Sequence, residues 1–169
     1  MGYQLIETIT VGVGGVASIE FTGIPGTGQD LVCLVSGRIA NTNSFNFTIN
    51  SNTGSVYSSI ALLGNGSAGY RIPSSSAANV FGGYVPTNNS YTANIFSSNS
   101  IYFSNYASSS NKSFSSDGVN ENNDSGSLAT IVAGGIADTN PITSIQLLPA
   151  ASQTWVQHTT ASIYTITAD

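Results

Sequence analysis

Short apolar stretches of strand length recur along the chain, separated by clusters of Gly, Asn, Ser and Pro. Ser44–Asn50 alternates most cleanly, with Phe45, Phe47 and Ile49 predicted to face inward, and Asp30–Ser36 is apolar on both faces and predicted to be central. The other predicted strands are Tyr3–Val11, Val16–Thr22, Ser55–Leu63, Tyr91–Phe96, Ser100–Tyr106, Leu128–Ala133, Ile142–Leu148 and Ser162–Thr167. Shorter strands also fit the pattern at Asn79–Tyr84 and Lys112–Ser116, and Trp155–Thr160 extends or precedes the last strand.

About ten strands at a spacing of roughly 8–12 residues predict an all-β, antiparallel β-sandwich. Both a jelly roll and an immunoglobulin-like sandwich fit this pattern. The length of 169 residues favours the jelly roll, because immunoglobulin-like domains have about 100 residues. We expect one domain, residues 1–169, with a long loop region at residues 64–89, where Gly, Ser and Asn abound and Pro73 and Pro86 occur.

Charge is sparse and limits the classes of partner. Only 7% of the residues are charged, the net charge is −5, and the basic residues are Arg38, Arg71 and Lys112. A nucleic-acid-binding surface needs clustered basic side chains, so we expect no nucleic-acid partner and no electrostatic attraction to anionic lipid. No apolar run approaches the ~18 residues of a membrane-spanning helix, and the N-terminus has no apolar signal region, so we expect no membrane association.

The residues that carry most enzyme chemistry are scarce. Cys33 and His158 are the only Cys and His, far apart in sequence, which argues against a catalytic thiol, a Ser–His–Asp triad and a zinc site. We expect Cys33 to be a buried apolar side chain and the protein to be no enzyme and to need no cofactor. The oxygen-rich segment Asp117–Gly126 could hold Ca²⁺, but the calcium-loop template puts Val132 where an acid is needed, which favours a solvated turn.

Aromatic side chains are the remaining candidates for binding. The five candidate contacts to a sugar or a protein partner are Tyr84, Tyr91, Tyr102, Tyr106 and Trp155. The competing interpretation places the same side chains in the core or on half-buried strand faces. The sequence pattern leaves both interpretations open, with the structural one favoured.

Several segments together resemble small virion proteins of tailed bacteriophages. They are Tyr3–Gly12, Ile19–Pro25, Asp30–Val32, Tyr102–Tyr106, Asn111–Asp117, Ile142–Leu147 and Ala161–Tyr164. The resemblance spans most of the chain, is weakest between Leu63 and Ser90, and rests on strand residues rather than on a catalytic signature. It implies a jelly-roll-like sandwich on the outside of a capsid or in a fibre, commonly trimeric, with no enzymatic residues to transfer.

On this basis we expect a capsid decoration or cement protein that binds the assembled head and stabilises it. The expected partners are the protein itself, as a homotrimer, and the major capsid protein or another virion protein. The expected location is the virion surface, after assembly in the bacterial cytoplasm, where a lone Cys33 stays reduced. The chain has little charge with which to keep exposed strand edges apart, and identical neighbours could cover those edges, which also favours a homotrimer. The alternatives are a carbohydrate-binding module of a phage fibre or spike, and a cellular lectin-like domain.

Overall fold

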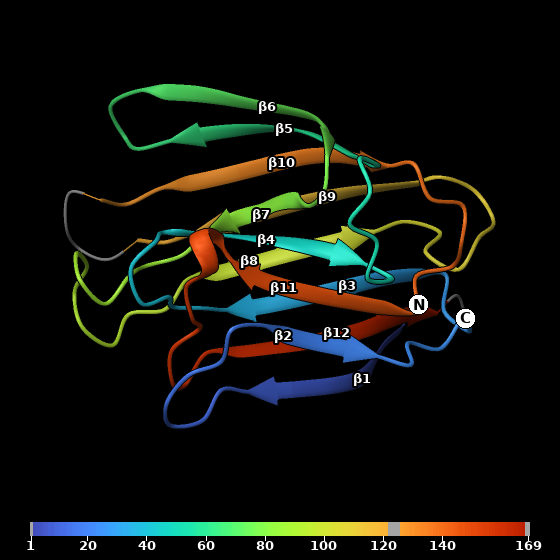
Figure 1. Ribbon diagram of the computed structural model, residues 1–169, viewed down its shortest axis with the longest axis horizontal. Helices are drawn as coiled ribbons and strands as arrows, with labels where there is room; N and C mark the ends of the chain where they lie inside the picture. The colour runs from blue at the N-terminus through green and yellow to red at the C-terminus, as the bar shows by residue number, and fades with distance from the viewer. Residues whose placement is uncertain (1, 122–125, 168–169) are drawn as a thin grey trace.

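Two antiparallel sheets pack face to face in a computed structural model that describes residues 2–121 and 126–167 (Figure 1). The large sheet contains, in spatial order, β1 (Gly2–Thr10), β12 (Thr160–Thr167), β3 (Asp30–Ser36), β8 (Ser98–Phe103), β9 (Lys112–Val119), β10 (Ala129–Ile136), β5 (Tyr57–Gly64) and β6 (Gly69–Ala77). The small sheet contains β2 (Ile19–Thr22), β11 (Ser144–Pro149), β4 (Ser44–Ile49) and β7 (Val80–Tyr84), and a short 3₁₀ turn, η1 (Ala150–Ser152), follows β11. The predicted all-β sandwich is confirmed.

The strands that alternate in sequence also alternate in burial. Along β4, Phe45, Phe47 and Ile49 are buried, as predicted. Strand β9 switches between buried and exposed at every residue, which is typical of a sheet with one face on the core. Strand β3 is central, as its apolar sequence predicts, because β12 and β8 pair with it on either side.

Strand pairing is nested along the chain. β1 pairs with β12, β2 with β11, β3 with β8 and β4 with β7. This nesting of first strand with last favours the jelly roll over the immunoglobulin-like alternative. Two hairpins are inserted into it: β5–β6 between β4 and β7, and β9–β10 between β8 and β11. Both join the large sheet, so it extends beyond the small one.

Two expectations about the middle of the chain are wrong. Residues 64–89 are not one long loop, because they contain β6 and β7. Within them, the short strand that fits the pattern at Asn79–Tyr84 is present as β7. Strand β6 lies at a sheet edge, where Pro73 is tolerated and a buried apolar face is not required. Conversely, the expected strand Tyr91–Phe96 is a loop, and three of its carbonyl groups accept hydrogen bonds from Arg38 instead of from a neighbouring strand.

Aromatic rings fill the space between the sheets. Phe47 of the small sheet packs edge-to-face on Phe103 and Phe114 of the large sheet, with ring centroids 5.6 and 5.1 Å apart. Phe45 packs on Trp155 at 5.4 Å. The contacts of Phe47 join the two sheets directly, and the contact of Phe45 joins the small sheet to the segment that precedes β12.

Candidate functional site

The structure removes two of the five candidate aromatic contacts from the surface. Trp155 and Tyr106 both have an exposed fraction of 0%. The Trp155 indole Nε1–H donates to the Leu147 carbonyl at 3.2 Å, and the Tyr106 hydroxyl donates to the Pro25 carbonyl. Of the two interpretations that the sequence left open, the core one therefore applies to Trp155 and Tyr106, and neither ring can contact a partner from this position.

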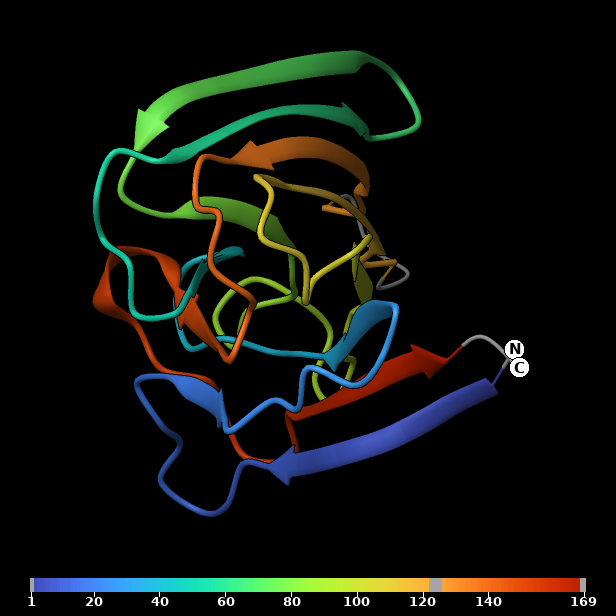
Figure 2. The same ribbon diagram turned by 90° about the vertical axis from the view of Figure 1, so that its right-hand side faces the viewer.

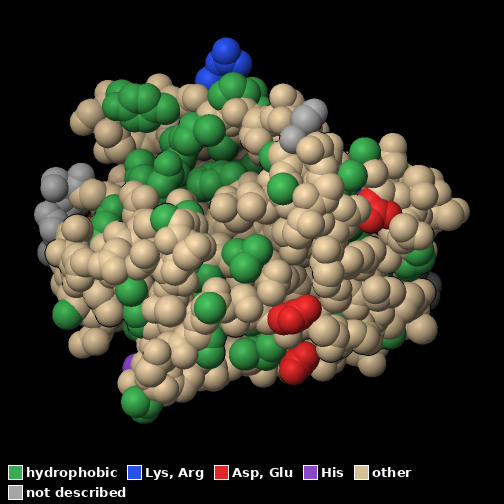
Figure 3. Space-filling model, in the orientation of Figure 1, with side chains coloured by type: hydrophobic (Ala, Val, Ile, Leu, Met, Phe, Trp, Pro, Cys, Tyr) green, Lys and Arg blue, Asp and Glu red, His purple; other side chains and the backbone are tan. Residues whose placement is uncertain are grey.

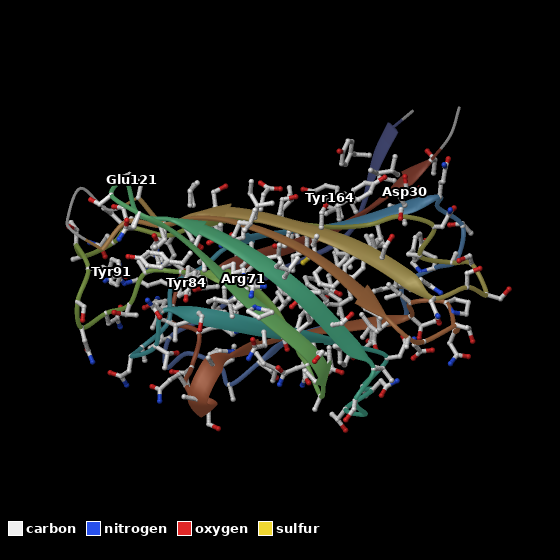
Figure 4. All side chains as sticks on the ribbon, turned by 90° about the horizontal axis from the view of Figure 1, so that it is seen from above. Asp30, Arg71, Tyr84, Tyr91, Glu121 and Tyr164 are labelled. Atoms are coloured by element: carbon white, nitrogen blue, oxygen red, sulfur yellow. The ribbon has the colours of Figure 1, made fainter. Side chains whose placement is uncertain are left out.

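Tyr102 is part of a local hydrogen-bonded pair rather than a free binding group. Its hydroxyl donates to the Asp30 carboxylate at 2.5 Å, and the other carboxylate oxygen accepts from the Asn105 N–H at 2.9 Å. The hydrogen bond to Asp30, together with burial, raises the pKa of Tyr102 to about 12. Asp30 therefore ties β3 and β8 to the turn that follows β8, far from Tyr84 and Tyr91 (Figure 4).

Tyr84 and Tyr91 remain as candidates and lie toward the same end of the sandwich (Figure 4). Both are half-buried. Burial raises the pKa of Tyr84, with a smaller contribution from Tyr91. Tyr84 also packs edge-to-face on Phe81, with ring centroids 5.2 Å apart, so each ring offers only part of its surface.

Arg38 organises the loops at this end of the sandwich. It is 4% exposed, and each of its five N–H groups has an acceptor. The acceptors are the carbonyl oxygens of Thr87, Tyr91, Thr92 and Ile95 and the side-chain oxygen of Asn88, at 2.7–3.2 Å. Burial lowers the pKa of Arg38. A single side chain thus holds the segment 87–95 in place, and no sequence signal marks this role because its partners lie 49–57 residues away.

A pocket of about 430 Å³ opens beside this loop. We call it the Arg38 pocket; its lining includes Arg38, Asn88, Asn94, Phe96, Gln157 and His158. Within the described part of the chain, the side chains of Asn94 and Gln157 form no hydrogen bond and are exposed. The pocket therefore offers free amide groups next to one aromatic ring. No carboxylate or thiol lines it that could serve His158 as a catalytic partner.

A second surface lies on the outer face of the large sheet. Leu62 and Ile131 are 56% and 62% exposed and stand directly opposite each other on β5 and β10. We call the patch around them the apolar panel; it consists of Ile60, Leu62, Val119, Ala129, Ile131 and Ala133, joined through strand register. The sequence predicts a strand at Leu128–Ala133 but not that its apolar residues face outward, because Thr130 and Val132 occupy the core side.

Basic charge is almost absent from the surface. Arg38 is buried, and the buried Lys112 ammonium donates to the carbonyl oxygens of Ser108 and Ser110. Of the three basic residues, only Arg71 on β6 is exposed. Partner contacts through positive charge therefore depend on one side chain.

The oxygen-rich segment Asp117–Gly126 is described only in part, since residues 122–125 lie outside the described residues. Among the residues that are described, no three His, Cys, Asp or Glu side chains gather in a way that could hold a metal ion. The described portion also contains no helix that is long and apolar enough to cross a membrane.

Cys33 is expected to be unreactive in the folded protein. It is 0% exposed on β3, and burial raises the pKa of its thiol to about 12. In the unfolded chain the thiol ionises near pH 8.5, so the unfolded state loses its proton first and the free energy of unfolding falls as the pH rises from about 8.5 toward 12. At pH 8 a thiol reagent such as dithionitrobenzoate should label the protein only after denaturation.

Cys33→Ser provides the control for this pH dependence. The variant should lose that part of the alkaline decline while costing about 1–3 kcal/mol of stability, because it buries a hydroxyl. Rapid labelling of the folded wild-type protein would contradict the burial of the thiol.

Comparison with known proteins yields neither a protein-family model nor a curated protein that matches this chain.

Proposed function

We propose that the protein is a structural component of a tailed-phage virion, a decoration or cement protein that binds the assembled head and stabilises it. The observation that supports this best is the apolar panel. Its four large side chains are 42–62% exposed on one face of a sheet, in a domain with little surface charge. Exposed contiguous apolar surface is typical of protein–protein contact sites. A protein that binds only the assembled shell stabilises that shell by mass action.

The proposed assembly is a homotrimer on the virion surface, bound to the major capsid protein or another virion protein. Electron microscopy of virions labelled against this protein tests the proposal directly. Decoration predicts labels distributed over the head, while a fibre component predicts labels confined to a few appendages. Absence of label from virions would refute both assignments.

A substitution in the apolar panel tests whether the protein binds heads through this surface. Ile131→Asp should lower the affinity for heads that lack the protein by at least about tenfold, because burying a large apolar side chain contributes about 1.5–3 kcal/mol. Ser113→Asp is the matched control, since Ser113 is exposed on the same sheet, on neighbouring β9, and lies outside the panel. Cosedimentation with heads measures both; equal binding by the two variants would contradict docking through the panel.

A second candidate function is carbohydrate binding at a fibre or spike, and the Arg38 pocket favours it. Sugar recognition uses fixed polar groups beside an apolar face, and the pocket places free Asn94 and Gln157 amides next to Phe96 on a loop that Arg38 holds. A glycan array tests it: Gln157→Ala should abolish a signal that Gln4→Ala, an exposed amide on β1, retains. No binding to any glycan by the wild-type protein would count against this candidate.

A further inference from the structure

A polar groove lies between the loop that Arg38 holds and the residues that lead into β4. Its volume is about 390 Å³. We call it the Tyr91 groove; its lining includes Thr42, Asn43, Ser44, Thr87, Ser90 and Tyr91. None of the described residues that line it also lines the Arg38 pocket, although both cavities border the segment 87–95. The Tyr91 groove is therefore a separate site for a ligand.

Hydrogen bonds from other parts of the chain hold the walls of the groove. Arg38 donates to the carbonyl oxygens of Thr87 and Tyr91 at 2.7 and 3.2 Å. The Thr42 hydroxyl donates to the Ala150 carbonyl of η1 at 3.1 Å. These contacts fix the shape of the groove before a ligand enters it, and a preformed site loses less conformational entropy on binding.

Polar side chains without a hydrogen-bond partner line the Tyr91 groove. Within the described part of the chain, the side chains of Asn43, Ser44 and Ser90 form no hydrogen bond. The Thr87 hydroxyl also has no partner, although Thr87 is only 2% exposed. Folding normally pairs a buried hydroxyl, because leaving it unpaired costs stability. An unpaired hydroxyl on a residue that lines an open groove therefore indicates a ligand that supplies the missing partner.

The groove is neutral and has aromatic rings beside it. Its described lining residues include no Asp, Glu, Lys or Arg. Figure 3 shows the described side chains of these four types away from the left end of the face, where the loops of the groove lie. Tyr91 is part of the lining, and Tyr84 is directly opposite Ser44 in the β4–β7 pair (Figure 4). Neutral sugars combine hydroxyl groups with an apolar C–H face that packs on aromatic rings, so their chemistry matches this lining.

We propose that the Tyr91 groove binds a neutral glycan. A sugar ring packs on Tyr91, and its hydroxyl groups pair with Asn43, Ser90 and Thr87. The inference goes beyond head decoration and assigns the molecule a second ligand. Figure 2 shows η1, which borders the groove through Ala150, on the side of the small sheet. The apolar panel faces the other way, on the outer face of the large sheet, so a copy docked through the panel keeps its groove accessible.

Binding of the purified protein to an array of neutral glycans and their sialylated counterparts tests the proposal. The wild-type protein should bind neutral members and gain nothing from sialic acid, because the described lining contains no basic side chain. Tyr91→Ala should weaken binding of the strongest neutral ligand at least about tenfold, since it removes the aromatic surface. Tyr70→Ala is the matched control and should bind like the wild type, because Tyr70 is exposed on β6, outside the groove.

Thr87→Val tests the unpaired hydroxyl. The free protein loses no hydrogen bond in this change, so its stability in urea should not fall. Its affinity for the glycan should fall about fivefold, because one hydrogen bond to the ligand is lost. Thr48→Val is the matched control and should keep the wild-type affinity. Thr48 is buried on β4 and its hydroxyl also has no partner, but it does not line the groove.

Failure of the wild-type protein to bind any neutral glycan would overturn the proposal, as would wild-type affinity in Tyr91→Ala or Thr87→Val. A signal that Gln157→Ala removes and Thr87→Val retains would assign the glycan to the Arg38 pocket instead. Circular dichroism of every variant confirms that it is folded before its binding is interpreted. The array contains no phage heads, so its result is separable from the proposed function. Loss of glycan binding would leave head decoration standing, and failure to bind heads would leave the groove standing.

Discussion

Replacing Arg38 with methionine is expected to lower the free energy of unfolding by about 3–5 kcal/mol, the range seen when one partner of a buried charged contact is removed. Methionine retains much of the apolar stem but donates no hydrogen bond. Four loop carbonyl groups and the Asn88 side-chain oxygen then lose their donor. A buried polar group without a partner costs about 1–3 kcal/mol, and the total stays below the sum because water reaches part of this loop.

Arg71→Met is the matched control for this prediction. It makes the same chemical change at an exposed arginine, so in the monomeric form its effect should stay within about 0.5 kcal/mol. Urea denaturation of both variants at low protein concentration measures the difference. An Arg38→Met protein that unfolds at the wild-type urea concentration would show that the segment 87–95 is held by other contacts.

Trp155→Ala is the second substitution with a large expected effect, a loss of about 3–5 kcal/mol. The indole is fully buried, packs on Phe45 and donates to the Leu147 carbonyl, so its removal leaves both a cavity and an unsatisfied acceptor. Small domains have a total stability of about 5–15 kcal/mol, so this variant approaches the limit of folding.

Trp155→Phe separates the two contributions. Phenylalanine keeps most of the buried apolar surface and loses the Nε1–H donor, so it should cost clearly less than alanine. Denaturation followed by circular dichroism gives both values, since the change removes the only tryptophan fluorophore. A Trp155→Ala protein as stable as the wild type would return Trp155 to the surface candidates.

The local pattern of apolar and polar residues was sufficient to predict strands whose burial follows that pattern. Strands β3 and β4 follow from their own residues because alternation, or its absence in a central strand, reflects burial directly. It was insufficient at β6, whose residues are mostly exposed, and at the segment 91–96, whose β-forming residues are held as a loop by a distant side chain. In that segment the hydrogen bonds from Arg38 override the β-propensity of the local sequence.

The candidate sites were harder to predict than the fold for the same reason. Tyr84 and Trp155 are both candidate contacts by sequence, yet one is half-buried and the other has no exposed surface. Which aromatic ring enters the core depends on how loops cross the ends of the sheets. The apolar panel and the Arg38 pocket each combine residues that are distant in sequence, and only the register of β5 with β10, or the position of Arg38, brings them together.

The hydrogen bonds from Arg38 to the segment 87–95 affect how freely the amino-acid sequence of that segment can vary. Four of its five acceptors are main-chain carbonyl oxygens, which every amino acid supplies. The identities of Thr87, Tyr91, Thr92 and Ile95 are thus largely uncoupled from the hydrogen bonds that shape the segment. One arginine in a conserved geometry can support many different surface sequences, so the tip of this sandwich is suited to diversification, by natural selection or by library design, without redesign of the scaffold beneath it.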